Sequence, residues 1–488
     1  MSIKKLVQLE CVNVQSVKRL VTAMSNKQRE EAETLFYQGN RCMKDGDATS
    51  AEACYRLALQ LQPDFAEAYA NLGLLLEKRN STVEAENCYR RSIELNPDYS
   101  ETHLDLGALL ANQKHFEEAE AAYRQAIVLS PDSPAGWSNL GVLCACMKRE
   151  DEAEQCYRTA MSLDDSYSQA RFNLSYLLLR QGRFEEGWYC LEARNWYASL
   201  TEHLDCARWQ GESVAGKSIL ICFEAGQGDV IQFCRYAAVL KAQGAASITL
   251  ICHPPLKALI MELESVDTVI AFDEQIPSSG WDYWTPLLSI PYYCKTRLDN
   301  IPAIIPYLHV PQDRIGKWDA QLSKDGLRVG LVWKGSTQFE NDTDRSLPSL
   351  EVLAPLGAVA DVSFVSLQKG AGEEEAMNPP RGLQLTHVGS QLTDFADTAA
   401  VVDKLDLVIC VDTAVAHLAG ALGKPCWVLL PDYKADWRWM ADRTDSPWYP
   451  GTMRLFRQPR MGDWDSVVSE VVAALGQWQR NTSRCNQL

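Results

Sequence analysis

The first 200 residues repeat one pattern of apolar and polar positions with a period of 34 residues. Each period reads as a helix A and a helix B, in which small residues let the two helices approach and a tyrosine fills the gap between repeats. A proline stops helix B before the next period begins. The pattern therefore predicts an α-solenoid of stacked helix pairs. The positions that keep the step are Gly39, Gly73, Gly107 and Gly141, then Ala51, Ala85, Ala119 and Ala153, then Tyr55, Tyr89, Tyr123 and Tyr157, and finally Pro63, Pro97 and Pro131.

The period and its residue types resemble the tetratricopeptide repeat. Four full repeats precede a weaker fifth, in which Ser175 and Gly187 replace the usual Gly and Ala. An aromatic cluster at the end of the fifth repeat predicts docking onto the following domain, and it consists of Trp188, Tyr189, Trp196 and Tyr197. The predicted boundaries are a lead at 1–31 and five repeats over 32–197, namely 32–65, 66–99, 100–133, 134–167 and 168–197.

One position of helix A is polar in almost every repeat. The sixth residue of successive repeats is Tyr37, Asn71, Asp105, Asn139 and Asn173. A carboxamide offers both a donor and an acceptor, which suits an extended peptide backbone. The row resembles the asparagine ladder of the eukaryotic protein O-GlcNAc transferases. That resemblance implies a protein or peptide acceptor in the repeat groove, bound by Asn71, Asp105, Asn139 and Asn173. The alternative is that asparagine simply satisfies the neighbouring helix.

After residue 216 the pattern changes to short apolar runs separated by turns. Continuous β-branched runs that alternate with helical stretches are typical of buried parallel strands. We predict an α/β region of two Rossmann-like domains in a GT-B arrangement, in which the two domains face each other across a cleft. The domains span 217–312 and 325–478, with a linker at 198–216 and a tail at 479–488. The predicted strands are 218–223, 247–252, 267–272, 328–333, 362–367, 405–411 and 426–431.

The net charge, the cysteines and the lengths of the apolar runs limit which partners and which cellular compartment we expect. The formal net charge of −17 repels phosphate backbones, so we expect no nucleic-acid partner. The sixteen cysteines form no Cys-x-x-Cys pair and several lie in apolar runs, which favours free thiols in a reducing cytoplasm. No run of about 18 apolar residues occurs, so no membrane span is expected.

The loop after the first predicted strand reads Glu224-Ala-Gly-Gln-Gly-Asp229-Val-Ile-Gln232. It lacks the Gly-x-Gly-x-x-Gly fingerprint of dinucleotide sites. It resembles the Gly-Asp loop of the glycosyltransferase family that includes the ADP-heptose transferases. The resemblance implies that Asp229 is the general base on the acceptor hydroxyl and that Gly228 and Gln232 border the acceptor. Alternatively, Asp229 only caps the helix that starts there.

A second motif, Asp412-Thr413-Ala414-Val-Ala-His417, follows a predicted strand. It resembles the Asp-Thr-Gly-x-x-His signature of the same family, which binds the diphosphate of the donor. The free N–H groups and partial positive charge of a helix N-terminus suit phosphates. The resemblance implies that Asp412, Thr413 and Ala414 hold the donor and that His417 assists catalysis by donating to the departing phosphate. Ala414 departs from the usual Gly, and a structural role for His417 is the alternative.

Weaker donor-side candidates lie at the ends of two other strands. Lys334 and Gly335 follow one strand, and Arg345 ends the loop beyond them. Gln368 and Lys369 follow another strand and are expected to border the nucleotide. In bacterial relatives a His occurs in the first loop, where this chain has Phe339. The Asp-Thr-Asp run at 342–344 is expected to be a solvated turn, and we expect no metal and no cofactor beyond the nucleotide-sugar donor, which is a substrate.

These features support a transferase that moves a sugar from a nucleotide-sugar to a protein acceptor held by the repeats. Two alternatives stay open. The acceptor could be a saccharide or a lipid-linked molecule, with the repeats recruiting other partners. The chain could also be a non-catalytic scaffold with a degenerate transferase domain.

Overall fold

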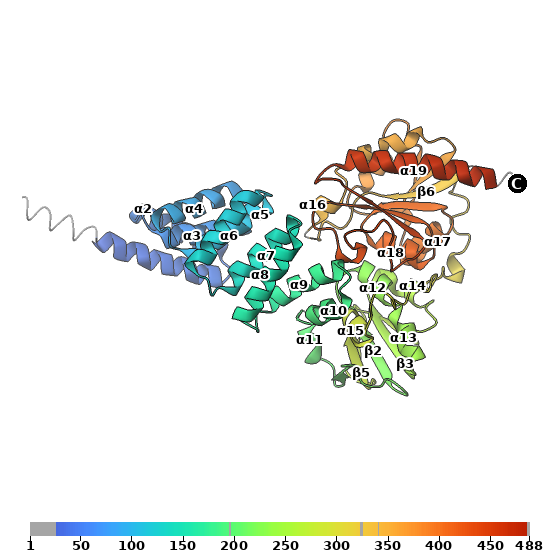
Figure 1. Cartoon of the computed structure of the whole chain (residues 1–488), viewed down its shortest axis with the longest axis horizontal. Helices are drawn as coiled ribbons and strands as arrows, with labels where there is room; N and C mark the ends of the chain where they lie inside the picture. The colour runs from blue at the N-terminus through green and yellow to red at the C-terminus, as the bar shows by residue number, and fades with distance from the viewer. Residues whose placement is uncertain (1–25, 195–196, 323–325, 340, 486–488) are drawn as a thin grey trace, which may run out of the picture. The chain divides into compact units, whose positions relative to one another are not determined.

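The computed structural model describes residues 26–194, 197–322, 326–339 and 341–485 (Figure 1). The chain divides into two compact units, Met1–Asn173 and Leu174–Leu488. Most of the predicted lead (1–25), Trp196 and the last three residues of the predicted tail lie outside the described residues.

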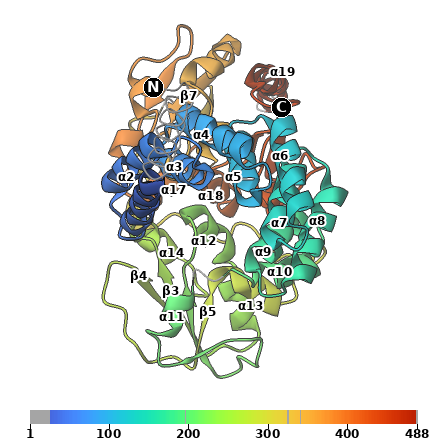
Figure 2. The same ribbon diagram turned by 90° about the vertical axis from the view of Figure 1, so that its left-hand side faces the viewer.

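The first unit is a stack of helix pairs, as the 34-residue period predicts (Figure 2). The α-solenoid is therefore confirmed. A helix over 26–44 precedes α2. The elements that follow are α2 (Ala48–Leu61), α3 (Ala66–Lys78), α4 (Thr82–Leu95), α5 (Ser100–Asn112), α6 (Phe116–Leu129), α7 (Pro134–Cys146), α8 (Glu150–Leu163) and the start of α9 (Ser168–Arg180).

The repeated glycine and tyrosine pack directly on each other. A Cβ added at Gly73 would lie 2.7 Å from Cε1 of Tyr89, and the same contact recurs at Gly141 with Tyr157. Tyr89 is fully buried. Glycine is therefore required because the tyrosine ring occupies the space that any side chain would need.

An exposed row of ion pairs also repeats along the helices of the first unit. Arg56 on α2 contacts Glu84 on α4 at 2.7 Å, and Arg90 on α4 contacts Glu118 on α6 at 2.7 Å. Exposed pairs of this kind contribute about 0.2–1 kcal/mol each. The unit is thus held mainly by its buried small and aromatic residues.

The second unit contains two parallel sheets, which confirms the predicted α/β region. The first sheet has the order β1-β5-β2-β3-β4. Its strands are β1 (Ala207–Arg208), β2 (Ser218–Cys222), β3 (Ser247–Cys252), β4 (Thr268–Ala271) and β5 (Tyr283–Pro286). Its helices are α11 (Ala198–Thr201), α12 (Gln227–Phe233), α13 (Tyr236–Ala242), α14 (Lys257–Ile260) and α15 (Ile290–Tyr293).

The second sheet has the order β11-β10-β9-β6-β7-β8. Its strands are β6 (Leu327–Val332), β7 (Val362–Ser366), β8 (Leu385–His387), β9 (Leu407–Val411), β10 (Cys426–Leu430) and β11 (Met453–Arg457). Val468 and Val471 of α19 pack against the buried face of the sheet, and α17 and α18 lie on the other side (Figure 1). The helices are α16 (Asp342–Arg345), α17 (Phe395–Asp403), α18 (Ala414–Ala421) and α19 (Trp464–Cys485).

Short 3₁₀ helices complete the second unit. They are η1 (Pro254–Leu256), η2 (Leu287–Ser289), η3 (Gln312–Arg314), η4 (Leu350–Ala358), η5 (Glu373–Met377), η6 (Gly389–Gln391) and η7 (Trp437–Trp439). In the part of the chain that the structure describes, no helix combines the length and the apolar character needed to span a bilayer.

Two features of the second unit differ from the predicted boundaries. The unit begins at Leu174, inside the predicted fifth repeat, because α10 (Phe184–Leu191) packs into its aromatic core. The Trp188 indole donates to the carbonyl of Thr296 at 3.1 Å and lies edge-on to Trp437 at 5.3 Å. The predicted linker at 198–216 contributes β1, which pairs with β5 at the edge of the first sheet.

Candidate active site

Asp229 lies in the first turn of α12, directly beyond the carboxyl end of β2. Its Oδ2 accepts from the backbone N–H of Gly226 at 2.7 Å, so the carboxylate caps the helix. Its Oδ1 accepts from Nη2 of Arg438, which lies beyond the carboxyl end of β10 in the second sheet. The contact joins the two sheets at the residue that the sequence nominates as the base.

Arg438 contacts the predicted base and is not among the site residues that the sequence predicts. It is buried, and its Nε donates to Oε1 of Gln232 at 2.8 Å. Its Nη1 lies 3.0 Å from both carboxylate oxygens of Asp436, and its guanidinium stacks on the Trp437 ring at 4.4 Å. The available signal was an arginine enclosed by two tryptophans in the loop after a buried strand, since such rings suit a guanidinium.

The electrostatics of Asp229 combine opposing effects. Burial raises the pKa of Asp229, because a charged carboxylate loses its hydration there. The positive charge of Arg438 acts in the opposite direction, and the negative charge of Asp436 adds to the rise. A carboxylate with a raised pKa is a stronger base, which suits proton abstraction from a hydroxyl.

His417 lies in the middle of α18 and is buried. Its Nδ1 is 2.9 Å from the hydroxyl of Tyr449, and its ring stacks on Trp439 at 5.2 Å. Burial lowers the pKa of His417 well below the usual value, and the cations Arg438 and Arg235 lower it further. The imidazole is therefore neutral, so it can donate one hydrogen bond without carrying a charge.

Gly228 brings the first turns of α12 and α18 together. A Cβ at Gly228 would lie 2.9 Å from Cδ2 of His417 and 3.5 Å from Cα of Ala414. The absence of a side chain at Gly228 therefore allows the two helices to come into contact, and its predicted place beside the acceptor stays a prediction. Because α12 follows β2 and α18 follows β9, the positive ends of two helix dipoles meet at one point.

Asp412 directly follows β9 and lies close to the charges of Asp436, Arg345 and Arg438. Burial raises the pKa of Asp412 to about 6, and the negative charge of Asp436 adds to the rise. Arg345 and Arg438 oppose it. The structure thus brings the predicted donor residues Asp412 and Arg345 close to each other, and Asp412 close to Arg438. Thr413 precedes α18 as its N-cap residue, although its side chain caps no backbone N–H of that helix.

Two predicted donor contacts are engaged elsewhere. The Lys334 ammonium pairs with Glu375 at 2.5 Å, so its charge is already balanced by the protein. Gln368 is buried, and its Oε1 accepts from the backbone N–H groups of Trp333 and Lys334 at 3.0 Å each. Its Nε2 donates to the carbonyls of Lys334 and Ala371. Both amide hydrogens of Gln368 are used in this way, so it is a backbone brace in this structure.

The remaining donor candidates make contacts within the protein. Arg345 and Gly335 lie in the loop after β6, and Lys369 follows β7. Arg345 contacts Asp342 at 3.2 Å and stacks on Phe339 at 4.2 Å. A Cβ at Gly335 would lie 2.5 Å from Nη2 of Arg345, so the glycine makes room for that guanidinium. The Lys369 ammonium donates to the carbonyl of Leu392 at 2.7 Å. Among the described residues, no group of three or more His, Cys, Asp or Glu side chains is arranged to hold a metal.

The side-chain amide of Gln232 is only partly satisfied by the residues around it. Gln232 is fully buried and its Oε1 is engaged by Arg438, which fixes the orientation of the amide. Its Nε2 has no hydrogen-bond partner among the described residues. A buried donor without a hydrogen-bond partner lowers the stability of the fold unless a ligand accepts its hydrogen bond. The acceptor role of Gln232 stays a prediction, for which this amide nitrogen offers a donor beside Asp229.

Two of the predicted acceptor residues of the first unit bond to neighbouring helices. Nδ2 of Asn71 donates to Oδ1 of Asn40 at 2.7 Å, and Nδ2 of Asn173 donates to the hydroxyl of Ser138 at 3.4 Å. Burial raises the pKa of Asp105 to about 6, with the charges of Glu77 and Glu101 adding to the rise. Asn139 lies at the equivalent place on α7 and is partly exposed. Oδ1 of Asn173 also accepts from Nε2 of Gln169 at 3.1 Å. A carboxamide has two donor hydrogens and two acceptor lone pairs, so these bonds leave capacity for a peptide.

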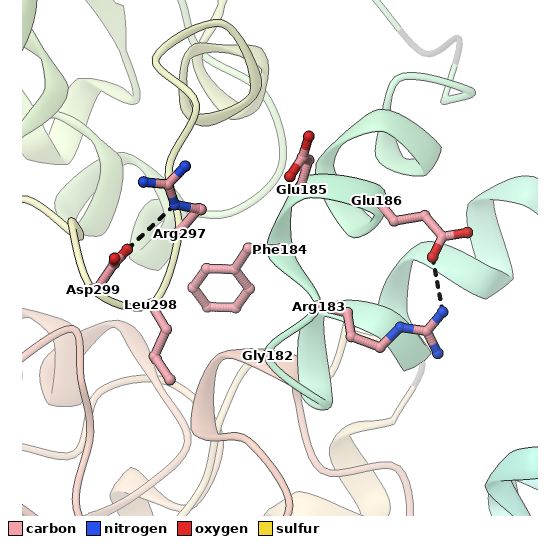
Figure 3. A pocket seen from close by; sticks show the side chains of 8 residues that line it. All are labelled: Gly182, Arg183, Phe184, Glu185, Glu186, Arg297, Leu298 and Asp299. Carbon is pink, nitrogen blue, oxygen red and sulfur yellow. Dashed lines mark hydrogen bonds and ion pairs between the residues drawn. The ribbon is translucent and has the colours of Figure 1, made fainter.

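A shallow depression lies away from these residues, between α10 and the segment 297–299 (Figure 3). Its volume is about 440 Å³. Phe184 forms its floor, and the charges at its rim pair with each other, Arg183 with Glu186 and Arg297 with Asp299. None of the predicted site residues lines it.

Comparisons with known families agree with both parts of the chain. Residues 358–429 match the glycosyltransferase family 9 (heptosyltransferase) model, and this stretch contains the motif from Asp412 to His417. Tetratricopeptide-repeat models match residues 39–80, 66–99, 88–121 and 135–167. The chain therefore combines tetratricopeptide repeats with a glycosyltransferase family 9 domain, which supports glycosyltransferase activity.

Similar proteins cover different shares of the chain. Protein FlbA of Caulobacter vibrioides is 26% identical over 336 residues, which are 62% of this chain and 54% of that protein. The chain thus spans about half the length of this curated relative. The structure of pilF from Pseudomonas aeruginosa is 20% identical and covers 34% of this chain and 76% of its own, with a TM-score of 0.33. The repeat protein TTC0263 of Thermus thermophilus is 20% identical and covers 35% and 99%, with a TM-score of 0.31.

Proposed function

We propose that the chain is a glycosyltransferase of the GT-B arrangement that moves a sugar from a nucleotide-sugar to a protein acceptor. The observation that carries the proposal is the meeting of Asp229 with the His417 helix. Both lie beyond the carboxyl ends of parallel strands, where ligands of such sheets bind. The first turns of α12 and α18 approach closely because Gly228 has no side chain.

Asp229 acts as the general base in this proposal. It takes the proton of the acceptor hydroxyl while that oxygen forms a bond to the anomeric carbon of the sugar. The bond from that carbon to the diphosphate breaks at the same centre, and its electron pair leaves with the diphosphate. Each oxygen of Asp229 accepts one hydrogen bond in the structure and keeps a second lone pair for the substrate.

The donor side stabilises the departing diphosphate. The N–H groups at the start of α18 supply a partial positive charge, and neutral His417 donates a hydrogen bond. Arg345, which lies near Asp412, adds a full positive charge. Lys334 and Gln368 are engaged by Glu375 and by backbone groups, so the proposal assigns them to holding the loops.

Arg438 is a positioning residue for the base. Its guanidinium holds Asp229, Gln232 and Asp436 in one buried network. Gln232 in turn presents its unpartnered Nε2 beside the base, where an acceptor oxygen would satisfy it. The proposal needs no metal, because two helix N-termini and arginines provide the positive charge.

We assign the repeats to the acceptor polypeptide, with the row from Asn71 to Asn173 along its backbone. The reaction is placed in the cytoplasm.

The test uses the purified full-length chain with a panel of nucleotide-sugars, with and without a protein extract. We expect slow donor hydrolysis with at least one nucleotide-sugar and sugar transfer onto polypeptides of the extract. Transfer only to saccharide or lipid-linked acceptors would contradict the protein acceptor. Nucleotide binding with neither hydrolysis nor transfer would indicate a scaffold.

A further inference from the structure

Three aromatic side chains lie together at one edge of the first sheet. Phe223, His253 and Phe272 follow the carboxyl ends of β2, β3 and β4, which are neighbours in the sheet. The Phe223 and Phe272 rings stack at 5.1 Å with an interplanar angle of 25°, and the His253 ring lies edge-on to both, at 4.9 and 5.5 Å. We call these three residues the aromatic platform. The helices α12 and α14 lie side by side at this edge (Figure 2).

The platform reaches the surface although aromatic residues favour burial. Phe272 is 43% exposed, and Phe223 and His253 are partly exposed. Phe223 also packs against the buried cluster of Leu220, Cys222, Ile251 and Trp284. The platform is therefore anchored in the core on one side and open on the other, which is how an aromatic binding surface is built.

One peptide unit connects the platform to Asp229. The carbonyl of Ala225 lies 3.1 Å from Nε2 of His253, and the N–H of Gly226, in the same peptide unit, donates to Asp229 at 2.7 Å. Standard peptide dimensions then place the imidazole nitrogen within about 8 Å of the carboxylate oxygen. Ala225 has φ of +59°, a strained conformation for a residue with a side chain. The loop thus holds the base and the rings at a fixed spacing.

We propose that the aromatic platform is an acceptor subsite that takes an apolar side chain next to the hydroxyl residue of a polypeptide. This inference rests on the proposed function, since it needs Asp229 at the acceptor hydroxyl. About 8 Å is little more than two residues of extended chain, so a residue adjacent to the hydroxyl residue reaches the rings.

The chemistry of the platform favours an apolar side chain over a sugar. A sugar ring on an aromatic surface also needs hydrogen-bond partners for its hydroxyl groups. The polar group within the platform, His253, is engaged with Ala225. Beside it, Lys257 is paired with Glu274 at 2.5 and 2.7 Å. The rings therefore offer apolar contact, and their area suits one side chain of the size of Leu, Met or Phe.

The test compares synthetic peptides that carry one Ser or Thr flanked by Leu, Phe, Gly or Asp. Binding to the full-length chain is measured by fluorescence anisotropy, and transfer is measured separately with the donor that the chain hydrolyses. We expect Leu- and Phe-flanked peptides to bind about 10-fold more tightly than Gly-flanked ones, in line with burial of one apolar side chain. The Phe272→Ala variant should lose this preference. Phe272 is chosen because it is the most exposed ring, so the fold tolerates its loss.

Met261→Ala is the matched control, since Met261 is 62% exposed in the same half and is not part of the platform. It should keep the full preference. Equal binding of all flanks, no binding of any peptide, or an unchanged preference in Phe272→Ala would overturn the proposal. Binding of lactose that disappears in Phe272→Ala would assign the platform to a glycan and would also overturn it. A chain that prefers Leu-flanked peptides but transfers no sugar would fail the proposed function alone.

Discussion

The two units differ in how far apart in the chain the partners of their glycines lie, and in whether their ion pairs are exposed or buried. In the repeat unit, the space beside Gly73 is filled by the ring of Tyr89, which belongs to the same repeat and lies 16 residues further along the chain. In the α/β unit, the space beside Gly228 is filled by His417 on α18, which follows a strand of the second sheet. The repeat unit pairs Arg90 with glutamates on its exposed surface, whereas Arg438 pairs with Asp229 in the interior.

This difference decides whether stability at a position depends on neighbouring residues or on distant parts of the chain. Contacts within and between adjacent repeats make the stability of a solenoid nearly a sum over neighbours. A buried ion pair between two sheets depends on both sheets being in place, and loss of one partner leaves an uncompensated charge. We therefore expect small, local effects from changes in the repeat unit and large, shared effects from changes around Asp229.

The largest expected effect concerns where the second unit begins. A fragment of residues 174–488 should fold and hydrolyse the donor, because it keeps Phe184 and Trp188 in the aromatic core. A fragment of residues 217–488 should aggregate, since it loses these side chains and β1. Each buried aromatic contributes about 1.5–3 kcal/mol. Circular dichroism melts of both fragments check this, and a cooperative melt of the shorter one at the same temperature would contradict it.

Replacing Arg438 by Met should give the next largest effect. The change leaves the partly buried carboxylates of Asp229 and Asp436 without their cation, which costs about 3 kcal/mol in the free energy of unfolding, the lower end for a buried pair. Without Arg438 the pKa of Asp229 rises further, so the acidic limb of the pH–rate profile should move to higher pH. Urea unfolding and the pH–rate profile measure both changes.

The Arg438→Lys variant distinguishes the effect of the positive charge from the effect of the guanidinium shape at this position. It keeps the positive charge but loses the planar fork that holds Asp229, Gln232 and Asp436 together. We expect an intermediate loss of stability and a smaller shift of the acidic limb. A Met variant as stable as the wild type would show that the contact between the sheets is incidental.

A smaller, stabilising effect is expected from Asp105→Asn in the repeat unit. The pKa of Asp105 is raised to about 6 by burial and by Glu77 and Glu101. The folded state therefore holds the proton more tightly, and this advantage is complete below about pH 3.8 and is lost as pH rises through about 6. At pH 8 the Asn variant should be more stable by about 1–2 kcal/mol, discounted for partial exposure. Urea unfolding at pH 8 and pH 4 checks this, and an equal gain at both values would contradict it.

The repeat unit could be predicted from the sequence because its contacts recur at one spacing. Gly73 with Tyr89 and Gly141 with Tyr157 are the same local contact, and a period makes it visible. The longer strands β2, β3, β6, β7, β9 and β10 were also predictable, because each is a continuous apolar run. The strands β1, β5, β8 and β11 were missed. Two of them, β1 and β8, have only two or three residues, and β5 and β11 are not continuous apolar runs.

The partners of the charged groups could not be read from the sequence. Lys334 and Gln368 follow strand ends as a donor site requires, yet Glu375 and backbone groups engage them. The Arg438–Asp229 pair joins residues 209 positions apart. No local pattern specifies such a pair, because it depends on how the two sheets meet. The motif around Asp412 and His417 was predictable because it is contiguous, and the family match covers it.

The most direct test of the account compares Asp229→Asn with His417→Ala in the full-length chain. Asn keeps an oxygen that can cap Gly226 but removes the basic carboxylate. Sugar transfer by Asp229→Asn should fall by about 10²–10⁴-fold while its affinity for the nucleotide-sugar, measured by calorimetry, stays within about twofold. His417→Ala should lose both donor affinity and transfer. Transfer by a folded Asp229→Asn variant at the wild-type rate would contradict the account, because Asp229 would then be only a helix cap.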